Sequence, residues 1–92
     1  MSVTVNLPTV LRPAAGGQRT VALEGDTVGE VLDSLGVAFP GVTTQVRSTD
    51  GTLHKFLNVY LNDDDVRYLG GLDAKVAPGD ELTLLPAVAG GR

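Results

Sequence analysis

Residues 27–35 carry the clearest helix pattern in the sequence, and a single helix of this kind limits the folds open to the chain. Thr27 and Glu30 have the spacing of a capping box, in which each side chain satisfies a backbone amide at the start of a helix. Gly36 follows, and glycine commonly ends a helix. We therefore expect one amphipathic helix that stops at Gly36. Its buried face would carry Val28, Val31, Leu32 and Leu35.

Four other segments have the composition or the alternation of strands with one buried face. The glycine-rich residues 14–17 predict a turn that joins the first two of them into a hairpin. Pro86 follows the last segment and should end it, because proline has no N–H to give to a ladder. The four segments are residues 2–7, 18–23, 54–62 and 81–85.

Weaker patterns predict the remaining connections. They are a short second helix at residues 41–47, a turn at 62–65, a short edge strand at 66–68, a helical turn near 72–75 and a tight turn at 78–80.

The order of these elements predicts an α+β fold, with a mixed sheet of four to five strands and one main helix packed on one face. This is the β-grasp arrangement of ubiquitin-like domains. The first and last strands are expected to be central neighbours in the sheet. We assign residues 1–86 to this domain and residues 87–92 to a flexible C-terminal tail.

Size and composition argue against several classes of function. A chain of 92 residues builds one modest core, which disfavours a self-contained enzyme. The absence of cysteine removes disulfides, thiolate catalysis and thiolate metal sites. The net charge of -4 argues against nucleic acid and against anionic membranes as partners. No signal peptide or membrane-spanning run is visible, so we expect a cytoplasmic protein.

A resemblance that covers almost the whole chain is carried by residues 3–13, 27–32, 57–67, 76–86 and 87–91. Together these segments resemble the MoaD/ThiS family of ubiquitin-fold sulfur carriers. The opening residues and the end of the tail are most similar to the CysO type, which supplies sulfur for cysteine synthesis. The resemblance implies a carrier that is not itself an enzyme.

The resemblance implies that Gly91 is the reacting residue. An adenylating partner would activate its carboxylate with ATP as an acyl-adenylate, and a sulfur donor would convert it to a thiocarboxylate. Gly90, Ala89 and Val88 would complete a tail that is narrow enough to enter another protein's active site. From Pro86 the tail can reach at most about 20 Å.

The partners that the resemblance implies are an adenylating enzyme, a sulfur donor, a cysteine synthase or another sulfur-accepting enzyme, and a processing peptidase. No cofactor is expected to be bound permanently, because ATP is used by the partner. A Gly-Gly pair alone would be weak evidence, since the chain has three such pairs. Gly90-Gly91 differs from the other two by its position after the last strand.

Other functional readings remain open. The acceptor pathway could be molybdopterin or thiamine synthesis, because the carrier fold does not encode the acceptor. The chain could also be a protein modifier that is joined to lysines through Gly91, or a plain interaction domain with an inert tail.

Phe56, Tyr60 and Leu85 are the candidate partner-binding residues. If Leu57, Val59 and Leu61 face the helix, the aromatic residues lie on the opposite face of the sheet, where exposed apolar side chains favour docking. The alternative is that one or both aromatic residues pack into a peripheral core under residues 39–53.

Two other features are better explained as parts of the surface than as metal-binding or catalytic sites. The run Asp63–Asp65 lacks the spacing of a calcium loop and is read as a solvated turn, so no metal site is expected. His54 has no evident nucleophile partner and is read as a surface residue at the start of a strand.

Arg92 departs from the family pattern, which ends on the second glycine. Either it is a precursor extension that a peptidase removes, or it is a harmless natural end. We expect removal, because the Gly91 carboxylate does not exist while the Gly91–Arg92 peptide bond is intact. Incubation with host lysate should therefore lower the intact mass by one arginine residue. Active sulfur transfer by a chain that keeps Arg92 would contradict this expectation.

Overall fold

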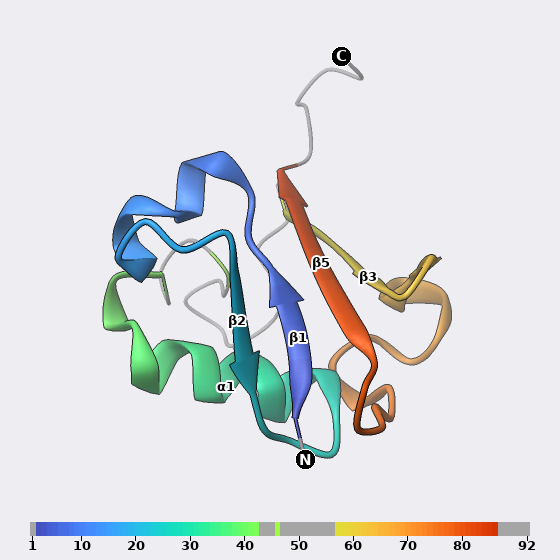
Figure 1. Ribbon diagram of the computed structural model, residues 1–92. Helices are drawn as coiled ribbons and strands as arrows, with labels where there is room; N and C mark the ends of the chain where they lie inside the picture. Colours follow the sequence, from blue (N-terminus) through green and yellow to red (C-terminus); the bar gives the residue numbers. More distant parts are fainter. Residues whose placement is uncertain (1, 43–45, 47–56, 87–92) are drawn as a thin grey trace.

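The computed structural model describes residues 2–42, 46 and 57–86, and in it one α-helix packs against one face of a five-stranded mixed sheet (Figure 1). The strand order across the sheet is β2-β1-β5-β3-β4. The predicted α+β class, with one main helix on one face of a mixed sheet, is confirmed. The elements are β1 (Val3–Asn6), β2 (Thr20–Leu23), α1 (Val28–Ala38), β3 (Leu57–Leu61), β4 (Asp64–Asp65) and β5 (Glu81–Pro86).

The C-terminal strand β5 occupies the centre of the sheet. It pairs in parallel with β1, where Val5 lies opposite Leu82, and antiparallel with β3, where Val59 lies opposite Leu84. The prediction that the first and last strands are central neighbours is therefore confirmed. All four of these residues are buried beneath α1.

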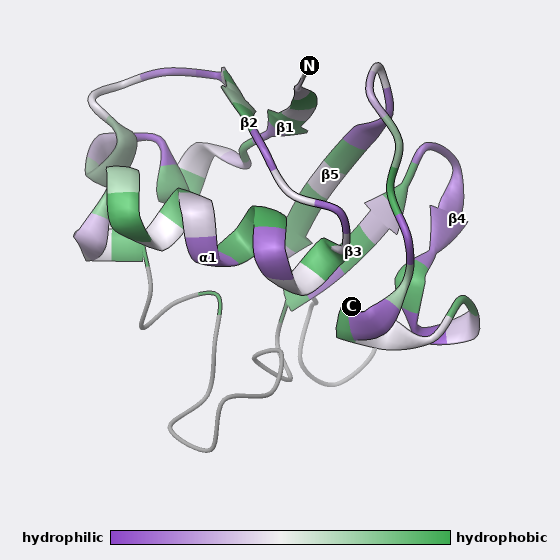
Figure 2. Cartoon of the chain, turned by 90° about the horizontal axis from the view of Figure 1, so that it is seen from below, coloured by the Kyte–Doolittle hydropathy of each residue, from purple (hydrophilic) through white to green (hydrophobic). Residues whose placement is uncertain are grey.

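The start of α1 follows the predicted capping pattern. Thr27 Oγ1 accepts a hydrogen bond from the Glu30 backbone N–H at 3.2 Å, and Glu30 Oε1 accepts one from the Asp26 backbone N–H at 2.9 Å. The first bond satisfies an amide that the helix itself leaves free, and the second engages the amide of the residue before the N-cap. The predicted apolar face is buried, and Figure 2 shows α1 alternating between apolar and polar residues along its length.

The prediction that Gly36 ends the helix is wrong, because α1 continues to Ala38. Phe39 caps it, and its backbone N–H donates to the Leu35 carbonyl at 2.8 Å. Pro40 provides the stop. A proline disfavours helical angles in the residue before it and has no N–H to continue the ladder.

The predicted edge strand at residues 66–68 is also wrong. Those residues form a 3-10 helix, η4 (Val66–Tyr68), and the edge strand is β4, within the predicted turn. The turn shrinks to two residues because Asn62 adopts a left-handed φ of 56°. Asp65 then accepts from the Arg67 backbone N–H at 2.9 Å, which favours a helical turn over an extended strand.

The connection between β1 and β2 contains two helical turns besides the predicted glycine-rich turn. Two 3-10 helices, η1 (Thr9–Leu11) and η2 (Pro13–Ala15), precede Gly16 and Gly17. Both glycines have positive φ, so the turn itself lies within the predicted residues 14–17. The prolines explain the helical turns, since each presets the local φ and removes a donor.

Of the predicted short helix at 41–47, the structure describes a 3-10 turn, η3 (Pro40–Val42), and the helical, buried Val46. The rest of that segment and residues 47–56, which include His54 and Phe56, lie outside the described residues. The predicted helical turn near 72–75 is found as η5 (Gly71–Asp73), and the tight turn at residues 78–80 is present. No helix among the described residues is long and apolar enough to cross a membrane.

Gly25 gives a specific test of how closely the β2–α1 connection approaches the helix. A Cβ at this position would lie 2.7 Å from the Val31 backbone nitrogen, closer than packed atoms allow. Gly25→Ala should therefore lower the free energy of unfolding by about 1–3 kcal/mol, measured by urea denaturation. Gly41→Ala is the control, because its new methyl would lie 3.4 Å from the Ala14 Cβ. Equal stability of the two variants would contradict the close approach.

Candidate functional site

The end of β5 is the point from which the chain continues towards its C-terminus. Pro86 is the last residue of this strand and of the described part of the chain, and the sequence continues for six residues. The predicted tail residues Val88, Ala89, Gly90 and Gly91 lie outside the described residues. The structure therefore defines where the tail begins, at the centre of the sheet and at the end opposite the N-terminus (Figure 1).

Leu85 and Tyr60 lie on the sheet face that α1 does not cover. Leu85 is 45% exposed, between the buried Leu84 and the exposed Pro86. Tyr60 is half-buried and lies opposite Thr83 in the register between β3 and β5. The structure thus brings two of the three predicted partner-binding residues to one hollow, which Thr83 also lines. The third, Phe56, lies outside the described residues.

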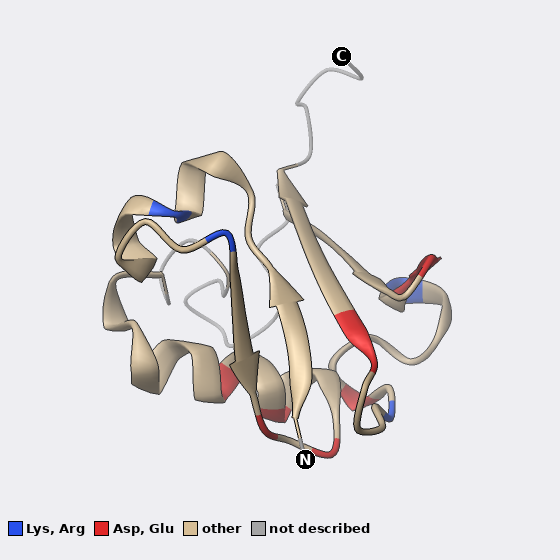
Figure 3. Cartoon of the chain, in the orientation of Figure 1, with Lys and Arg blue, Asp and Glu red and all other residues tan. Residues whose placement is uncertain are grey.

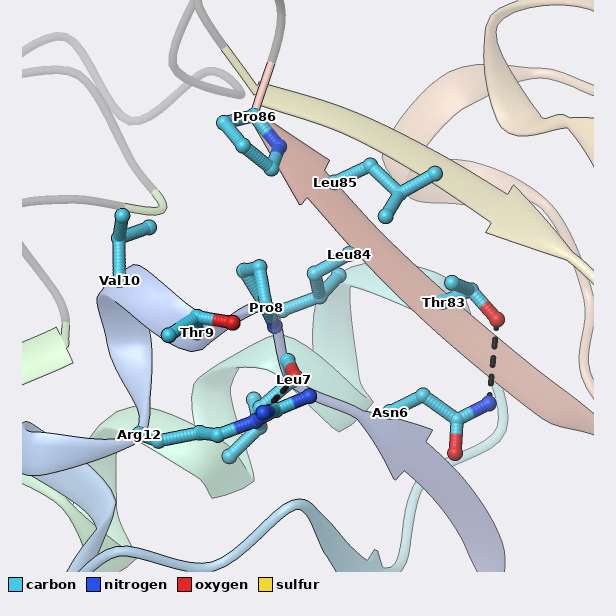
Figure 4. Close-up of a pocket in the computed structure, with 10 residues that line it drawn as sticks. All are labelled: Asn6, Leu7, Pro8, Thr9, Val10, Arg12, Thr83, Leu84, Leu85 and Pro86. Atoms are coloured by element: carbon cyan, nitrogen blue, oxygen red, sulfur yellow. Dashed lines mark hydrogen bonds between the residues drawn. The ribbon is translucent and has the colours of Figure 1, made fainter.

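A second hollow, of about 380 Å³, opens beside Leu85 where the chain leaves β1 (Figure 4). Its apolar wall consists of β5 residues and of the segment around Pro8 and Val10. Leu85 and Thr83 line both hollows, so the two form one continuous surface. We call the group Val10, Tyr60, Leu85 and Pro86 the tail-exit patch, beside which the buried Pro8 lines the larger hollow.

Val10 and Pro8 were missed by the sequence reasoning, which named only Phe56, Tyr60 and Leu85 as partner-binding residues. In η1 the side chain of Leu11 is buried, while that of Val10 is 61% exposed and stands beside the end of β5 (Figure 4). The signal in the sequence was an adjacent apolar pair between two prolines. Because the flanking prolines limit strand pairing in this segment, it forms a helical turn. One side chain of the pair, Leu11, then faces the core, and the other, Val10, is exposed.

Asp63 lines the smaller hollow, whereas the polar groups of the larger hollow are neutral or already engaged. Asn6 Nδ2 donates to Thr83 Oγ1 at 3.1 Å, which links β1 to β5 across the open face. Arg12 Nε donates to the Leu7 carbonyl at 3.1 Å and so fixes the segment that carries Val10. Among the described residues, those that line the larger hollow are apolar or neutral except for Arg12. An exposed apolar surface of this kind suits the binding of a partner.

The negative charge of the chain is concentrated away from this patch. Figure 3 shows most of the described acidic residues around the end of the molecule where β1 begins, opposite the end of β5. The net negative charge of the chain therefore lies mostly away from the surface where the tail begins. That surface presents apolar groups at its centre.

The acidic run at residues 63–65 has structural roles. Asp64 and Asp65 form β4, and Asp65 binds Arg67 through both its backbone N–H and its guanidinium. Within the described part of the chain, no group of three or more His, Cys, Asp or Glu side chains is placed to hold a metal ion.

Comparison with known proteins identifies the fold and the relatives. The ThiS family matches residues 5–91. The sulfur carrier protein CysO of Mycobacterium tuberculosis is 50% identical over 93 residues, which cover 99% of this chain and 100% of that protein. The small archaeal modifier protein 1 of Haloferax volcanii is 40% identical over 78 residues, which cover 82% of this chain and 85% of that protein.

A solved structure gives the same result. The chain superimposes on one from the crystal structure of the Amycolatopsis orientalis BexX/CysO complex with a TM-score of 0.89 and 48% identity, covering 97% of this chain and 99% of that chain. The predicted resemblance to MoaD/ThiS carriers is thereby confirmed. The chain therefore belongs to the ThiS/MoaD family of ubiquitin-fold proteins, among relatives that are sulfur carriers.

Proposed function

We propose that this chain is a sulfur carrier that cycles between a carboxylate and a thiocarboxylate at Gly91, after removal of Arg92. The observation that carries the proposal is a near-full-length similarity to CysO sulfur carriers. The position of β5 supports it. A central strand that ends six residues before the C-terminus gives the tail a fixed starting point beside an apolar surface.

The proposed chemistry takes place in the partner enzyme. A carboxylate oxygen of Gly91 attacks the α-phosphorus of ATP, and pyrophosphate leaves. The sulfur of a sulfide-level donor then attacks the carbonyl carbon of the acyl-adenylate, a C–S bond forms, and AMP leaves with the oxygen that joined it to the carbonyl. No oxidant or reductant is needed if the donor sulfur is already at the level of sulfide.

The tail-exit patch would hold the body of the carrier on the adenylating enzyme while the tail enters the nucleotide site. Its residues surround Pro86, the root of the tail, so binding of the partner to this patch brings the tail to the enzyme in one orientation. Apolar side chains at the centre of a surface contribute most to binding when docking removes them from water. Phe56, from the strand-start segment beside Leu57, is proposed to extend the same surface.

The sulfur acceptor is proposed to be a cysteine synthase, with a peptidase that releases the product from the carrier. The support is the similarity to sulfur carrier proteins named CysO. The resemblance seen in the sequence implies that this type supplies sulfur for cysteine synthesis. Molybdopterin and thiamine synthesis are the alternative destinations of the sulfur. The geometry of the described residues does not distinguish these acceptors, because the same tail and patch would serve each of them.

A protein modifier is the second candidate function. The similarity to small archaeal modifier protein 1, at 40% identity over most of both chains, favours it. The chemistry is shared up to the acyl-adenylate. The two functions then differ in the nucleophile, which is a sulfur atom for the carrier and the amine of a target lysine for the modifier.

The first test measures the modification itself. The chain that ends at Gly91 is incubated with ATP, sulfide and an adenylating enzyme, and its intact mass is recorded. We expect a gain equal to the replacement of one oxygen by one sulfur, located in the C-terminal peptide. Gly91→Ala should lower the yield sharply, because a Cβ at the reacting residue restricts the tail within a narrow channel. Conjugates on a denaturing gel without any sulfur gain would favour the modifier.

The second test concerns the tail-exit patch. Leu85→Ala and Tyr60→Ala should each weaken binding to the adenylating enzyme by about 1–2 kcal/mol, or about 5-fold to 30-fold in Kd. Val37→Ala is the matched control, since Val37 is 83% exposed but lies on α1, which covers the other face of the sheet. Calorimetric titration gives Kd, and melting gives Tm. A large loss of Tm with unchanged Kd would show that these residues serve the core instead.

A further inference from the structure

We propose that Arg67 is a positioning residue for the chemistry at the C-terminus. Its guanidinium holds the first residues of β3 beside Pro86 and thereby fixes the direction in which the tail leaves the sheet. This inference rests on the carrier function proposed above.

The need for such a residue arises because β4 is short. β4 pairs only with Tyr60 and Leu61, at the far end of β3. Leu57, Asn58 and Val59 extend beyond β4 and have no ladder partner from it. The chain instead turns into η4, and Arg67 from that turn reaches back to the start of β3.

Arg67 supplies the backbone donor that a longer β4 would have supplied, and a second donor to a side chain of β3. Its Nη2 donates to the Leu57 carbonyl at 3.1 Å, and its Nη1 donates to Asn58 Oδ1 at 2.7 Å. Asp65 holds the arginine in turn, with Oδ1 accepting its backbone N–H at 2.9 Å and Oδ2 lying 3.7 Å from Nη1. A planar guanidinium fixes both acceptors together, which a flexible ammonium does not do.

The residues that Arg67 holds are those that flank the root of the tail. Leu57 lies opposite Pro86, and Asn58 lies opposite Leu85. At the other end of the ladder the Asn62 N–H donates to the Glu81 carbonyl at 2.7 Å. Because the bonding edge alternates along a strand, Asn58 also bonds towards β5, whereas Leu57 faces the β4 edge, where Arg67 binds it.

The pair formed by Leu57 and Pro86 therefore has no ladder hydrogen bond of its own. Leu57 directs its polar backbone groups to the other edge, and Pro86 has no N–H to offer. The start of β3 is kept beside Pro86 by the Asn58–Leu85 pair, by the burial of Leu57 in the core and, from the other edge, by Arg67. Loss of the arginine would remove the only polar contact among these that acts on the Leu57 carbonyl in the described residues.

The direction of the chain at Pro86 matters once the body of the carrier is docked on the partner. The tail must then run from Pro86 into the active site of the partner, and a changed exit direction opposes the correct placement of the carboxylate. A misplacement of about 1 Å can cost on the order of 100-fold in rate when two reacting groups must meet. Arg67 would thus act on the rate of adenylation through Leu57 and Pro86, without touching the reacting atoms.

The test combines hydrogen exchange with adenylation kinetics for Arg67→Ala and Arg67→Lys. In the full chain, the Asn58 and Leu85 amides should exchange faster in both variants, while the Tyr60 amide stays protected. In chains ending at Gly91, ATP–pyrophosphate exchange with an adenylating enzyme should show kcat lowered by about tenfold and KM changed less than twofold. Arg19→Ala is the control, because it removes one exposed positive charge and should change neither measurement.

Each result decides the proposal. Unchanged exchange at Asn58 and Leu85 in Arg67→Ala would overturn it, since Arg67 would then hold nothing. A raised KM with unchanged kcat would also overturn it, because Arg67, whose side chain is 46% exposed, would then be a direct partner contact. Wild-type exchange and wild-type kcat in Arg67→Lys would also overturn it, because positive charge alone, and not the guanidinium geometry, would then be sufficient. If the wild-type chain is not adenylated by any enzyme tested, the carrier function fails, and the exchange measurement still decides whether Arg67 holds β3.

Discussion

The parallel pairing of β1 with β5 is the contact on which the rest of the molecule depends. It joins residues about 75 positions apart, as the Asn6 to Glu81 hydrogen bond at a separation of 75 shows. Closing so long a loop costs chain entropy, which the buried residues of both strands must offset. Once the two strands are adjacent, β2 and β3 add to the outer sides, and α1 covers the apolar face. The same pairing sets the end of β5 at the centre of the sheet and so determines where the tail begins.

Local patterns in the sequence were sufficient for the main elements because each pattern agrees with the tertiary structure. The Thr27 cap, the apolar face of α1 and the alternation in β1 and β5 all lead to one sheet and one helix. The errors fell where a neighbour overrode a residue's average preference. Gly36 is a common helix terminator, but Pro40 set the end of α1. Val66 has the composition of a strand, but the bond between Asp65 and the Arg67 amide turned the chain.

The candidate site was less accessible to sequence reasoning because its residues meet only in three dimensions. Leu85 and Tyr60 follow from strand alternation, since each lies opposite to core residues of its own strand. Val10 does not, because η1 and η2 place it beside β5 through a path that no periodic pattern encodes. Arg67 is similar: the run of residues 63–67 looks like an ordinary charged turn, and its contacts with Leu57 and Asn58 appear only after β3 and η4 are adjacent. Gly91 was assigned through the family resemblance, and it lies beyond the described residues.

The central position of β5 also has a mechanical consequence. A pull on the C-terminus, such as a bound partner would exert, is directed along a strand that is bonded on both sides. Such a load is shared by the β1 and β3 ladders at once, in shear, whereas a strand at an edge can be peeled away one pair at a time. The folded body is in this way resistant to being unravelled from its C-terminal end.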